Sequence, residues 1–322
     1  MRKVLFATTA LVALGGVSAA SADISVSAAN EFKYTSWSDN YAASTSSNKS
    51  SFASTTSYKI SASTVTDNGL TMSSYTAQDG SSGAFNDMGF TIGGDFGTLG
   101  FGASESGDAF ETATDVTPDE SNSLSTTDAA LTALPADAHV DSSSVSYKSP
   151  AIGGFQFAAG INEGGASDGS SFGAQYSMTA GDSTITLKYA QSGGKKALTS
   201  DANDIEATSV GLVVAYGDMT VTMADNSKST DGYGAVSAYD FSAQSVGVTY
   251  AMNDALTVSA YTGSTEDGKD TSHEMTDTGF GAAYTVTPGL TLSVTYNDWS
   301  LKDSGLTNRD GSKTSVALDL SF

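Results

Sequence analysis

The sequence predicts an all-β protein, a closed barrel of sixteen antiparallel strands that crosses a membrane. Three observations predict this fold: apolar and polar residues alternate along many short segments, tight turns join these segments in pairs, and apolar residues are scarce. Hydrophobic residues make up only 39% of the 322 residues, while Gly numbers 34 and Pro 4. A barrel that encloses water needs an apolar outer face only, which fits this composition.

The chain begins with the pattern of an export signal. Arg2 and Lys3 precede an apolar stretch at residues 4–17, and small residues at 20–22 match a signal-peptidase site. The stretch is shorter than the roughly 20 residues of a helical membrane span, which weighs against a retained anchor. We therefore expect residues 1–22 to be a cleaved signal peptide and residues 23–322 to form a single barrel domain.

Charge and cysteine content exclude several classes of function. Without Arg2 and Lys3, 12 basic residues stand against 36 acidic ones, a formal charge of −24. This balance argues against a nucleic-acid partner, because phosphate binding requires a basic footprint. The chain has no Cys, which excludes disulfides and thiol chemistry.

The carboxyl-terminal segment shows the alternation most clearly. From residue 316 to residue 322, every second residue is Val, Leu or Phe, and the residues between them are Ala, Asp and Ser. Successive side chains of a strand point to opposite faces, so this segment has one apolar face and one polar face.

Earlier segments repeat the alternation in pairs joined by short turns. These turns contain Gly, Pro, Asn or Asp, as tight antiparallel turns require. Tyrosines recur just before them at intervals of 40, 34 and 34 residues, namely Tyr176, Tyr216, Tyr250 and Tyr284. Tyrosines at a fixed distance from one end are typical of the aromatic girdle of a membrane barrel. A soluble β-sandwich or propeller could also place tyrosines at strand ends, but the regular change between short turns and long loops favours the barrel.

Along the mature chain the alternating segments number sixteen. Seven turns and eight loops connect them, which leaves both chain ends on one side, as a closed antiparallel barrel requires. The predicted strands are 24–36, 52–65, 70–77, 85–93, 98–103, 141–148, 155–162, 171–178, 183–191, 206–216, 219–226, 240–252, 256–263, 276–286, 290–299 and 313–322.

The longest connection, at residues 104–140 between the fifth and sixth strands, is acidic throughout. Within it, residues 128–134 are expected to form one or two helical turns, with Leu131 and Leu134 placed to anchor the segment to a wall. The segment has no Lys or Arg, and its carboxylates are Glu105, Asp108, Glu111, Asp115, Asp119, Glu120, Asp128 and Asp137.

Two motifs that flank this connection resemble the general Gram-negative porins. They are residues 94–102, Gly-Asp-Phe-Gly-Thr-Leu-Gly-Phe-Gly, and residues 145–155, Val-Ser-Tyr-Lys-Ser-Pro-Ala-Ile-Gly-Gly-Phe. The terminal Phe322 is similar to the signal by which that family's carboxyl-terminal strand is recognised by the barrel-assembly machinery. The resemblance covers the whole mature chain and is closest to the alphaproteobacterial porins.

This resemblance implies an outer-membrane barrel of a Gram-negative bacterium, usually a homotrimer, in contact with lipid and lipopolysaccharide. It also implies that the third loop folds into the lumen, where its acidic residues face basic residues of the wall. By position the acidic set is Glu105, Asp108, Glu111, Asp115, Asp119 and Glu120. The alternation places Lys33, Lys59 and Lys188 on the inner wall. The family's wall cluster is rich in Arg, whereas the only Arg after residue 22 is Arg309. We therefore do not expect the strong electric field across the pore that is typical of the family.

The predicted function is passive diffusion of small hydrophilic solutes and ions through a water-filled pore. The acidic loop and the negative total charge predict a weak to moderate preference for cations. Alternatively, the loop acids bridge lipopolysaccharide or bind calcium outside the pore. The same barrel could instead be a substrate-selective channel, or a plugged barrel that acts as an adhesin or structural protein. Aromatics along the lumen would favour the selective channel, and a lack of conductance would favour the plugged barrel.

Features typical of enzymes and metal sites have little support. Residues 169–173, Gly-Ser-Ser-Phe-Gly, have the spacing of a nucleophile elbow but open an alternating strand, so we expect no enzyme. Two loop histidines, His139 and His273, give no transition-metal pattern, and residues 193–196 are predicted to be an exposed loop tip. We expect no cofactor except a possible structural Ca²⁺. The candidate loop carboxylates, which do not match an EF-hand, are Glu163, Asp168, Glu266 and Asp267.

Overall fold

The computed structural model describes residues 23–39, 50–78, 87–102, 144–162, 167–198, 201–230, 239–268, 274–302 and 309–322. Among these residues, no helix is long and apolar enough to cross a membrane. The strands are β1 (Asp23–Asp39), β2 (Ser50–Val65), β3 (Thr71–Gln78), β4 (Asp87–Gly94), β5 (Gly97–Gly102), β6 (Ser144–Lys148), β7 (Phe155–Asn162), β8 (Ser167–Ala180), β9 (Ser183–Leu198), β10 (Asp201–Tyr216), β11 (Met219–Thr230), β12 (Tyr239–Ala251), β13 (Leu256–Asp267), β14 (Glu274–Thr287), β15 (Leu290–Lys302) and β16 (Arg309–Ser321).

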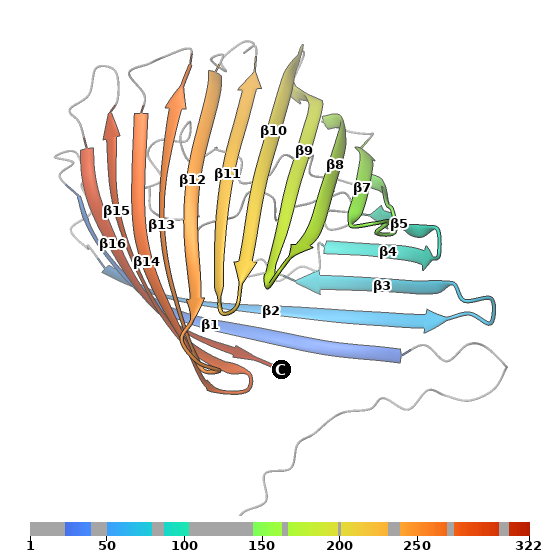
Figure 1. Ribbon diagram of the computed structural model, residues 1–322, viewed down its shortest axis with the longest axis horizontal. Coiled ribbons are helices and arrows are strands. Elements are labelled where there is room, and N and C mark those ends of the chain that lie inside the picture. The colour runs from blue at the N-terminus through green and yellow to red at the C-terminus, as the bar shows by residue number, and fades with distance from the viewer. Residues whose placement is uncertain are drawn as a thin grey trace, which may run out of the picture.

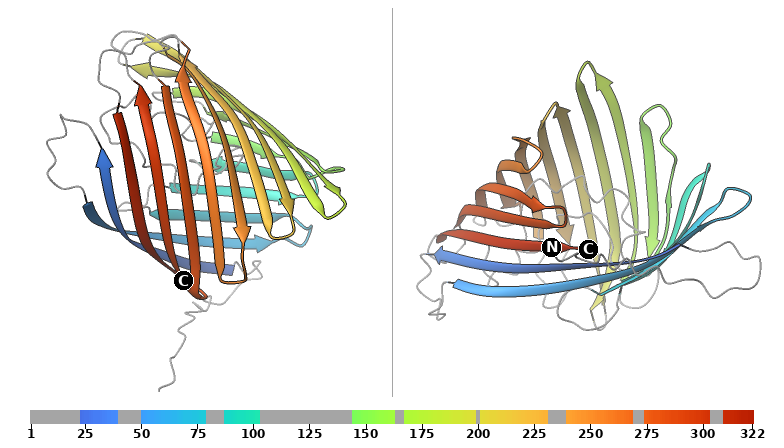
Figure 2. Two further views of the ribbon diagram at one scale, coloured as in Figure 1. Left: turned by 60° about the vertical axis from the view of Figure 1, so that its left-hand side comes forward. Right: turned by 90° about the horizontal axis from the view of Figure 1, so that it is seen from below.

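The sixteen strands form one closed antiparallel barrel, which confirms the predicted fold. Each strand pairs with its neighbours in the sequence, and β1 pairs with β16 to close the ring. This closing seam joins residues 29–39 of β1 to residues 311–321 of β16 in an unbroken register. Figure 1 and the two views of Figure 2 show the strands as a continuous wall that returns to its beginning.

The short turns and the end of the chain lie at the same end of the barrel. The turn between β6 and β7 shows why glycine is needed there, because Gly154 has a φ of 85°. A Cβ at Gly154 would also overlap the carbonyl oxygen of Ser177 on β8. At this end Phe322 donates its N–H to the carbonyl oxygen of Ala28 at 3.0 Å, next to the turns (Figure 1).

Strand limits differ from the prediction mainly on the loop side. Residues 193–196, predicted as a loop tip, lie inside β9, which continues to Leu198. Residues 169–173 lie inside β8. The ladder continues past the apolar band, where outward side chains no longer need to be apolar, so the alternation stops before the strand pairing does.

The outer face carries an apolar band with exposed aromatic residues. Phe32 stacks on Phe52 at 5.6 Å between ring centroids, and Phe90 stacks on Phe101 at 4.6 Å. The four tyrosines predicted to form a girdle are exposed on the outer face near the short turns: Tyr176, Tyr216, Tyr250 and Tyr284. Their contact with a membrane interface stays a prediction.

Candidate functional site: the inner wall of the barrel

The inner face of the wall is polar. Residues directly paired on neighbouring antiparallel strands point to the same face, so the register identifies the inward side chains around the ring. Ser73 and Thr91 share a hydrogen bond of 2.6 Å, and Gln175 donates through Nε2 to Oε1 of Gln156 at 2.9 Å. Two further inner pairs are Ser177–Thr186 and Ser209–Asn226. Cross-strand bonds of this kind suit a wall that faces water.

The structure places the three predicted wall lysines on the inner face. Lys33 Nζ lies 3.4 Å from Glu31 Oε2 on the same strand. Lys59 Nζ lies 4.5 Å from the centroid of the Tyr75 ring, a cation–π distance. Lys188 is paired with inward-facing positions of β8 and β10. The part these lysines take in selecting solutes stays a prediction.

The register adds three inward lysines that the sequence analysis missed: Lys148, Lys228 and Lys313. Each occupies an inward place in its strand's alternation, so extending the pattern to the strand ends would have found them. Lys148 is close enough to Lys188 for their charges to interact. Lys313 is buried and is paired with Trp37 of β1. Among lysines whose side chains the structure describes, only Lys302 points outward.

Carboxylates share the inner face with these lysines. Glu31 of β1 and Asp319 of β16 are direct cross-strand partners, and Asp267 and Asp277 also face inward. Acidic side chains of the predicted third loop lie at 104–140, outside the described residues. The positions of Glu105, Asp108, Glu111, Asp115, Asp119 and Glu120 relative to the lysines therefore stay a prediction.

Three inward aromatic rings each lie against a glycine of the next strand. The glycines have no Cβ, which leaves room for a ring across the neighbouring backbone, and at Gly279 and Gly311 a Cβ would overlap the ring. In strand register these aromatic–glycine pairs are Tyr75–Gly89, Tyr261–Gly279 and Trp299–Gly311.

Tyr261 is also the centre of a polar network on the inner wall. Its hydroxyl donates to Oδ2 of Asp277 at 2.9 Å and accepts from the side-chain amide of Asn297. Tyr261 and Trp299 are only 5% and 7% exposed. These two rings therefore belong to the wall and offer little surface to a passing solute.

The described residues give no support to a metal site. No group of three or more His, Cys, Asp or Glu among them could hold an ion. Glu266 and Asp267, predicted as loop carboxylates, instead lie on opposite faces of β13, because that strand continues past the apolar band. Oδ1 of Asp267 accepts the backbone N–H of Asp240 at 3.1 Å. Other candidate positions fall outside the described side chains: Glu163, Asp168, His139 and His273.

Phe322, the predicted assembly signal, follows the last residue of β16. Its side chain is 75% exposed, although its backbone is bonded to Ala28 of β1. The terminal ring is therefore accessible to a partner, and its use as a recognition signal stays a prediction.

Several solved structures share this architecture. A loop-deletion mutant of OmpT, an outer membrane protein of Vibrio cholerae, aligns with a TM-score of 0.70 at 14% identity, over 94% of this chain and 99% of that one. The anion-selective porin from Comamonas acidovorans aligns with a TM-score of 0.66 at 12% identity, over 94% and 100%. The outer membrane channel DcaP of Acinetobacter baumannii aligns with a TM-score of 0.67 at 13% identity, over 94% of this chain and 97% of that one. At these identities the likeness shows the fold.

The sequence itself identifies the family. No match was found among curated proteins. A family model described as Gram-negative porin matches residues 7–304, most of the chain. Together with the closed barrel and its polar inner wall, this match establishes that the chain belongs to the Gram-negative porins, outer-membrane channels for passive diffusion.

Proposed function

We propose that this porin passes small hydrophilic solutes with a preference for cations. We place the selecting region where the acidic segment 104–140 faces the lysines of the inner wall. The carrying observation is the number of carboxylates in that segment, set against the lysines and carboxylates of the inner wall.

Strands β5 and β6 have the fewest described residues of the sixteen strands, six and five. At about 3.4 Å per residue and a tilt of about 40°, the last described residue of β5 lies roughly 15 Å from the turns. That height falls within a lipid-facing band about 25 Å tall. The sequence predicts no strand from residue 104 to residue 140, and backbone N–H and C=O groups cannot remain unpaired in hydrocarbon, which supports a path of this segment into the lumen.

Charge supports the preference for cations. The segment 104–140 brings eight carboxylates and no Lys or Arg. Among the side chains that the structure describes, the inner wall brings six lysines, together with the carboxylates of Glu31, Asp267, Asp277 and Asp319. An acidic excess at the narrowest part of a pore raises the local cation concentration.

The test is the reversal potential of the purified protein in a planar bilayer under a tenfold KCl gradient. A potential of the sign for K⁺ is expected. Neutralising the acidic set should move the reversal potential toward zero. The substitutions are Glu105→Gln, Asp108→Asn, Glu111→Gln, Asp115→Asn, Asp119→Asn and Glu120→Gln. Asp298→Asn, on the outer face, is the matched control and should leave it unchanged. A Cl⁻-directed potential of the unmodified protein would refute the preference; a porin of this fold that is anion-selective shows that both signs are attainable.

We also propose a homotrimer in contact with lipid and lipopolysaccharide, assembled through recognition of the carboxyl-terminal strand. One similar structure, OmpT of Vibrio cholerae, was solved in a trimer form. The exposed ring of Phe322 supports the recognition step. Native mass spectrometry in detergent is expected to give three chains, each beginning at Asp23. Phe322→Ala should lower the amount of assembled barrel in outer membranes, while a monomer of normal conductance would contradict the trimer.

A substrate-selective channel has one observation in its favour, the inward aromatic rings. Tyr261 and Trp299 are buried against the wall, however, and the general diffusion pore remains the better account. Graded sugars added to the bilayer separate the two functions. A general pore loses conductance smoothly with sugar size, whereas a selective channel shows saturable block by a preferred sugar. A plugged barrel would show no conductance at all.

A further inference from the structure

The first strand runs past the last one at the turn side of the barrel. Pairing of β1 with β16 begins at Ala29, and the outermost backbone bonds beyond it join Ala28 and Phe322. On its other side, β1 is paired with β2 from Asp23 onward. Residues 23–27 therefore form an edge, the β1 edge, with which no described residue pairs on the side of β16. Figure 1 shows β1 and β2 continuing past the end of the chain marked C.

The backbone groups of Ile24 and Val26 point toward this open side. Ala28 donates its N–H to Phe322 at 3.4 Å and accepts the N–H of Phe322 at 3.0 Å. In an antiparallel ladder every second residue bonds to the same neighbouring strand, so Val26 and Ile24 point the same way as Ala28. The β1 edge thus offers two N–H groups and two C=O groups, and such a row is a template for a further strand.

The β1 edge lies beyond the apolar band, on the side of the short turns. Phe322 and Ala28 lie next to the turns, and Asp23 is five residues farther along β1. This distance is about 13 Å at 3.4 Å per residue and a 40° tilt. The outward side chains there are apolar, with Ile24 56% and Val26 68% exposed. An unpaired backbone beside exposed apolar side chains suits a partner that supplies both hydrogen bonds and apolar contacts.

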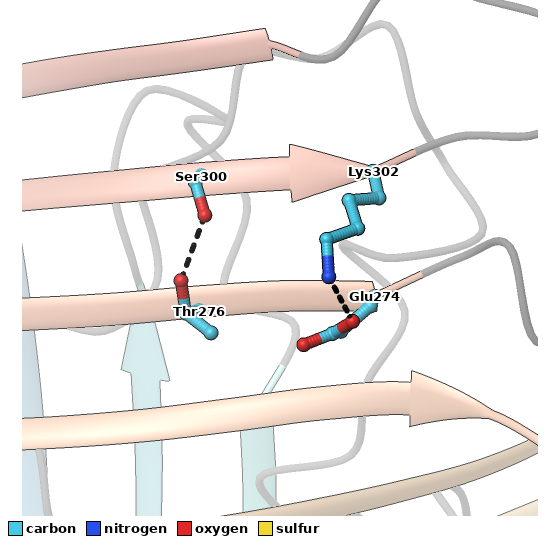
Figure 3. A network of polar contacts seen from close by, with 4 residues as sticks. All are labelled: Glu274, Thr276, Ser300 and Lys302. Atoms are coloured by element: carbon cyan, nitrogen blue, oxygen red, sulfur yellow. Dashed lines mark hydrogen bonds and ion pairs between the residues drawn. The ribbon is translucent and has the colours of Figure 1, made fainter.

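The turn side is acidic, which indicates the charge of such a partner. Asp23 belongs to the β1 edge itself and is exposed. The outward Lys302 lies at the opposite end of the wall, where its Nζ bonds Oε2 of Glu274 at 2.5 Å beside the Thr276–Ser300 pair (Figure 3). Five of the seven short turns carry one exposed Asp each, and none of the seven carries Lys or Arg; the five are Asp67, Asp95, Asp182, Asp218 and Asp254.

The inner lysine beside this edge is directed away from it. Lys59 of β2 is the cross-strand partner of Ser27. Its Nζ lies 4.5 Å from the centroid of the Tyr75 ring on β3, on the side of β2 that is far from β1. A cation beside the β1 edge therefore meets the carboxylate of Asp23 with little repulsion from Lys59.

We propose that the β1 edge binds an extended basic segment of a periplasmic protein, which adds a strand in line with β16. Its backbone bonds Ile24 and Val26, and its residues opposite these two are apolar. Its alternate residues, opposite Asp23 and Ser25, are basic. A second copy of the chain does not fit, because copies in one membrane share the membrane normal as their axis. A strand tilted by about 40° from that axis cannot lie antiparallel beside its own copy.

The experiment is fluorescence anisotropy of a labelled seven-residue peptide in which lysine and valine alternate. It is titrated with the full mature barrel in a non-ionic detergent, at about 150 mM NaCl to screen long-range attraction. Val26→Pro should weaken binding about fivefold, because proline removes one edge donor and leaves the bonds to β2 in place. Val26→Thr keeps this N–H and is the matched control, with binding expected within about twofold of the unmodified protein.

A second peptide, with proline in place of each valine, carries the same charge but lacks the N–H groups that a strand needs there. It should bind at least about fivefold more weakly than the first. Hydrogen exchange read by mass spectrometry needs no substitution in the barrel. The amides of residues 24 and 26 should exchange about tenfold more slowly when the first peptide is bound.

Unchanged single-channel conductance of Val26→Pro is expected, because residue 26 faces away from the pore; this shows that the variant barrel is intact. Equal binding by Val26→Pro and Val26→Thr would overturn the proposal, since the edge N–H would then play no part. Equal binding of the two peptides would overturn it too, by reducing the interaction to attraction between charges. Slow exchange at residues 24 and 26 without peptide would also overturn it, by showing that the edge is already covered.

Discussion

Gly279→Ala is expected to push the ring of Tyr261 off the wall and into the lumen. Gly279 of β14 is the direct cross-strand partner of Tyr261. A Cβ at Gly279 would overlap the ring atoms Cε1 and Cζ and the hydroxyl oxygen. Because several atoms of a rigid ring are involved, a small rotation cannot relieve the overlap. The displaced hydroxyl loses its bonds to Asp277 and Asn297.

The cost follows from three contributions. Overpacking costs about 1–3 kcal/mol, and each of the two lost hydrogen bonds costs about 0.5–1.5 kcal/mol. Replacing Gly by Ala within a strand returns about 0.5–1 kcal/mol of chain entropy. The free energy of unfolding should therefore fall by about 3 kcal/mol, combining these terms.

Urea-dependent unfolding and refolding in lipid vesicles measures this loss through tryptophan fluorescence. In a Tyr261→Ala background, Gly279→Ala should cost less than about 0.5 kcal/mol, because the ring is gone. Gly93→Ala on β4 is the matched control, since the closest atom to its Cβ would be Thr98 Oγ1 at an ordinary 3.5 Å. An equal cost in both backgrounds would refute the packing of ring on glycine as the cause.

Three further substitutions test other parts of the wall in the same unfolding assay. Phe280→Arg puts a charge on the lipid face at a residue that is 57% exposed. It should lower the free energy of unfolding by about 2–4 kcal/mol, whereas Ser300→Arg, near the loop end, should lower it by about 0–1 kcal/mol. Similar losses for the two variants would contradict the placement of the apolar band. Gly154→Ala should lower the free energy of unfolding by about 2 kcal/mol more than Gly217→Ala. Both glycines have a positive φ, but only a Cβ at Gly154 meets a neighbouring carbonyl oxygen. Equal losses would show that the backbone conformation alone determines the loss of stability. Lys302→Met should cost under about 1 kcal/mol, since the ion pair with Glu274 is largely exposed, and a loss above about 2 kcal/mol would contradict this estimate.

The architecture of the barrel was accessible from the sequence because its outer face must be apolar at every second residue. Alternation at residues 316–322 therefore located β16, and the same pattern with Gly, Asn, Asp and Pro located the turn-side strand ends. On the loop side, pairing continues where outward residues face water. The ends of β9 and β10 and the strand position of Glu266 were missed for this reason.

The inner wall was predictable only in part. Alternation around Tyr34, Tyr58 and Leu187 indicated the inward direction of the neighbouring lysines, and the structure places them there. Contacts between residues on different strands could not be predicted from the local sequence pattern, because these contacts depend on the register of the strands. The pairing of Tyr261 with Gly279 and the extension of β1 past β16 both needed the whole ladder.

The seam between the first and last strands also bears on how the protein folds. Thr35 and Ser315 stand 280 positions apart, yet their hydroxyls lie 3.5 Å from each other across the seam. Such a contact order makes closure slow, since the loop entropy of nearly the whole chain is lost before these pairs form. Once formed, the closed part of the barrel has no free strand edge from which the sheet can begin to unpair. The lifetime of the folded state is therefore set by the barrier to reopening the seam.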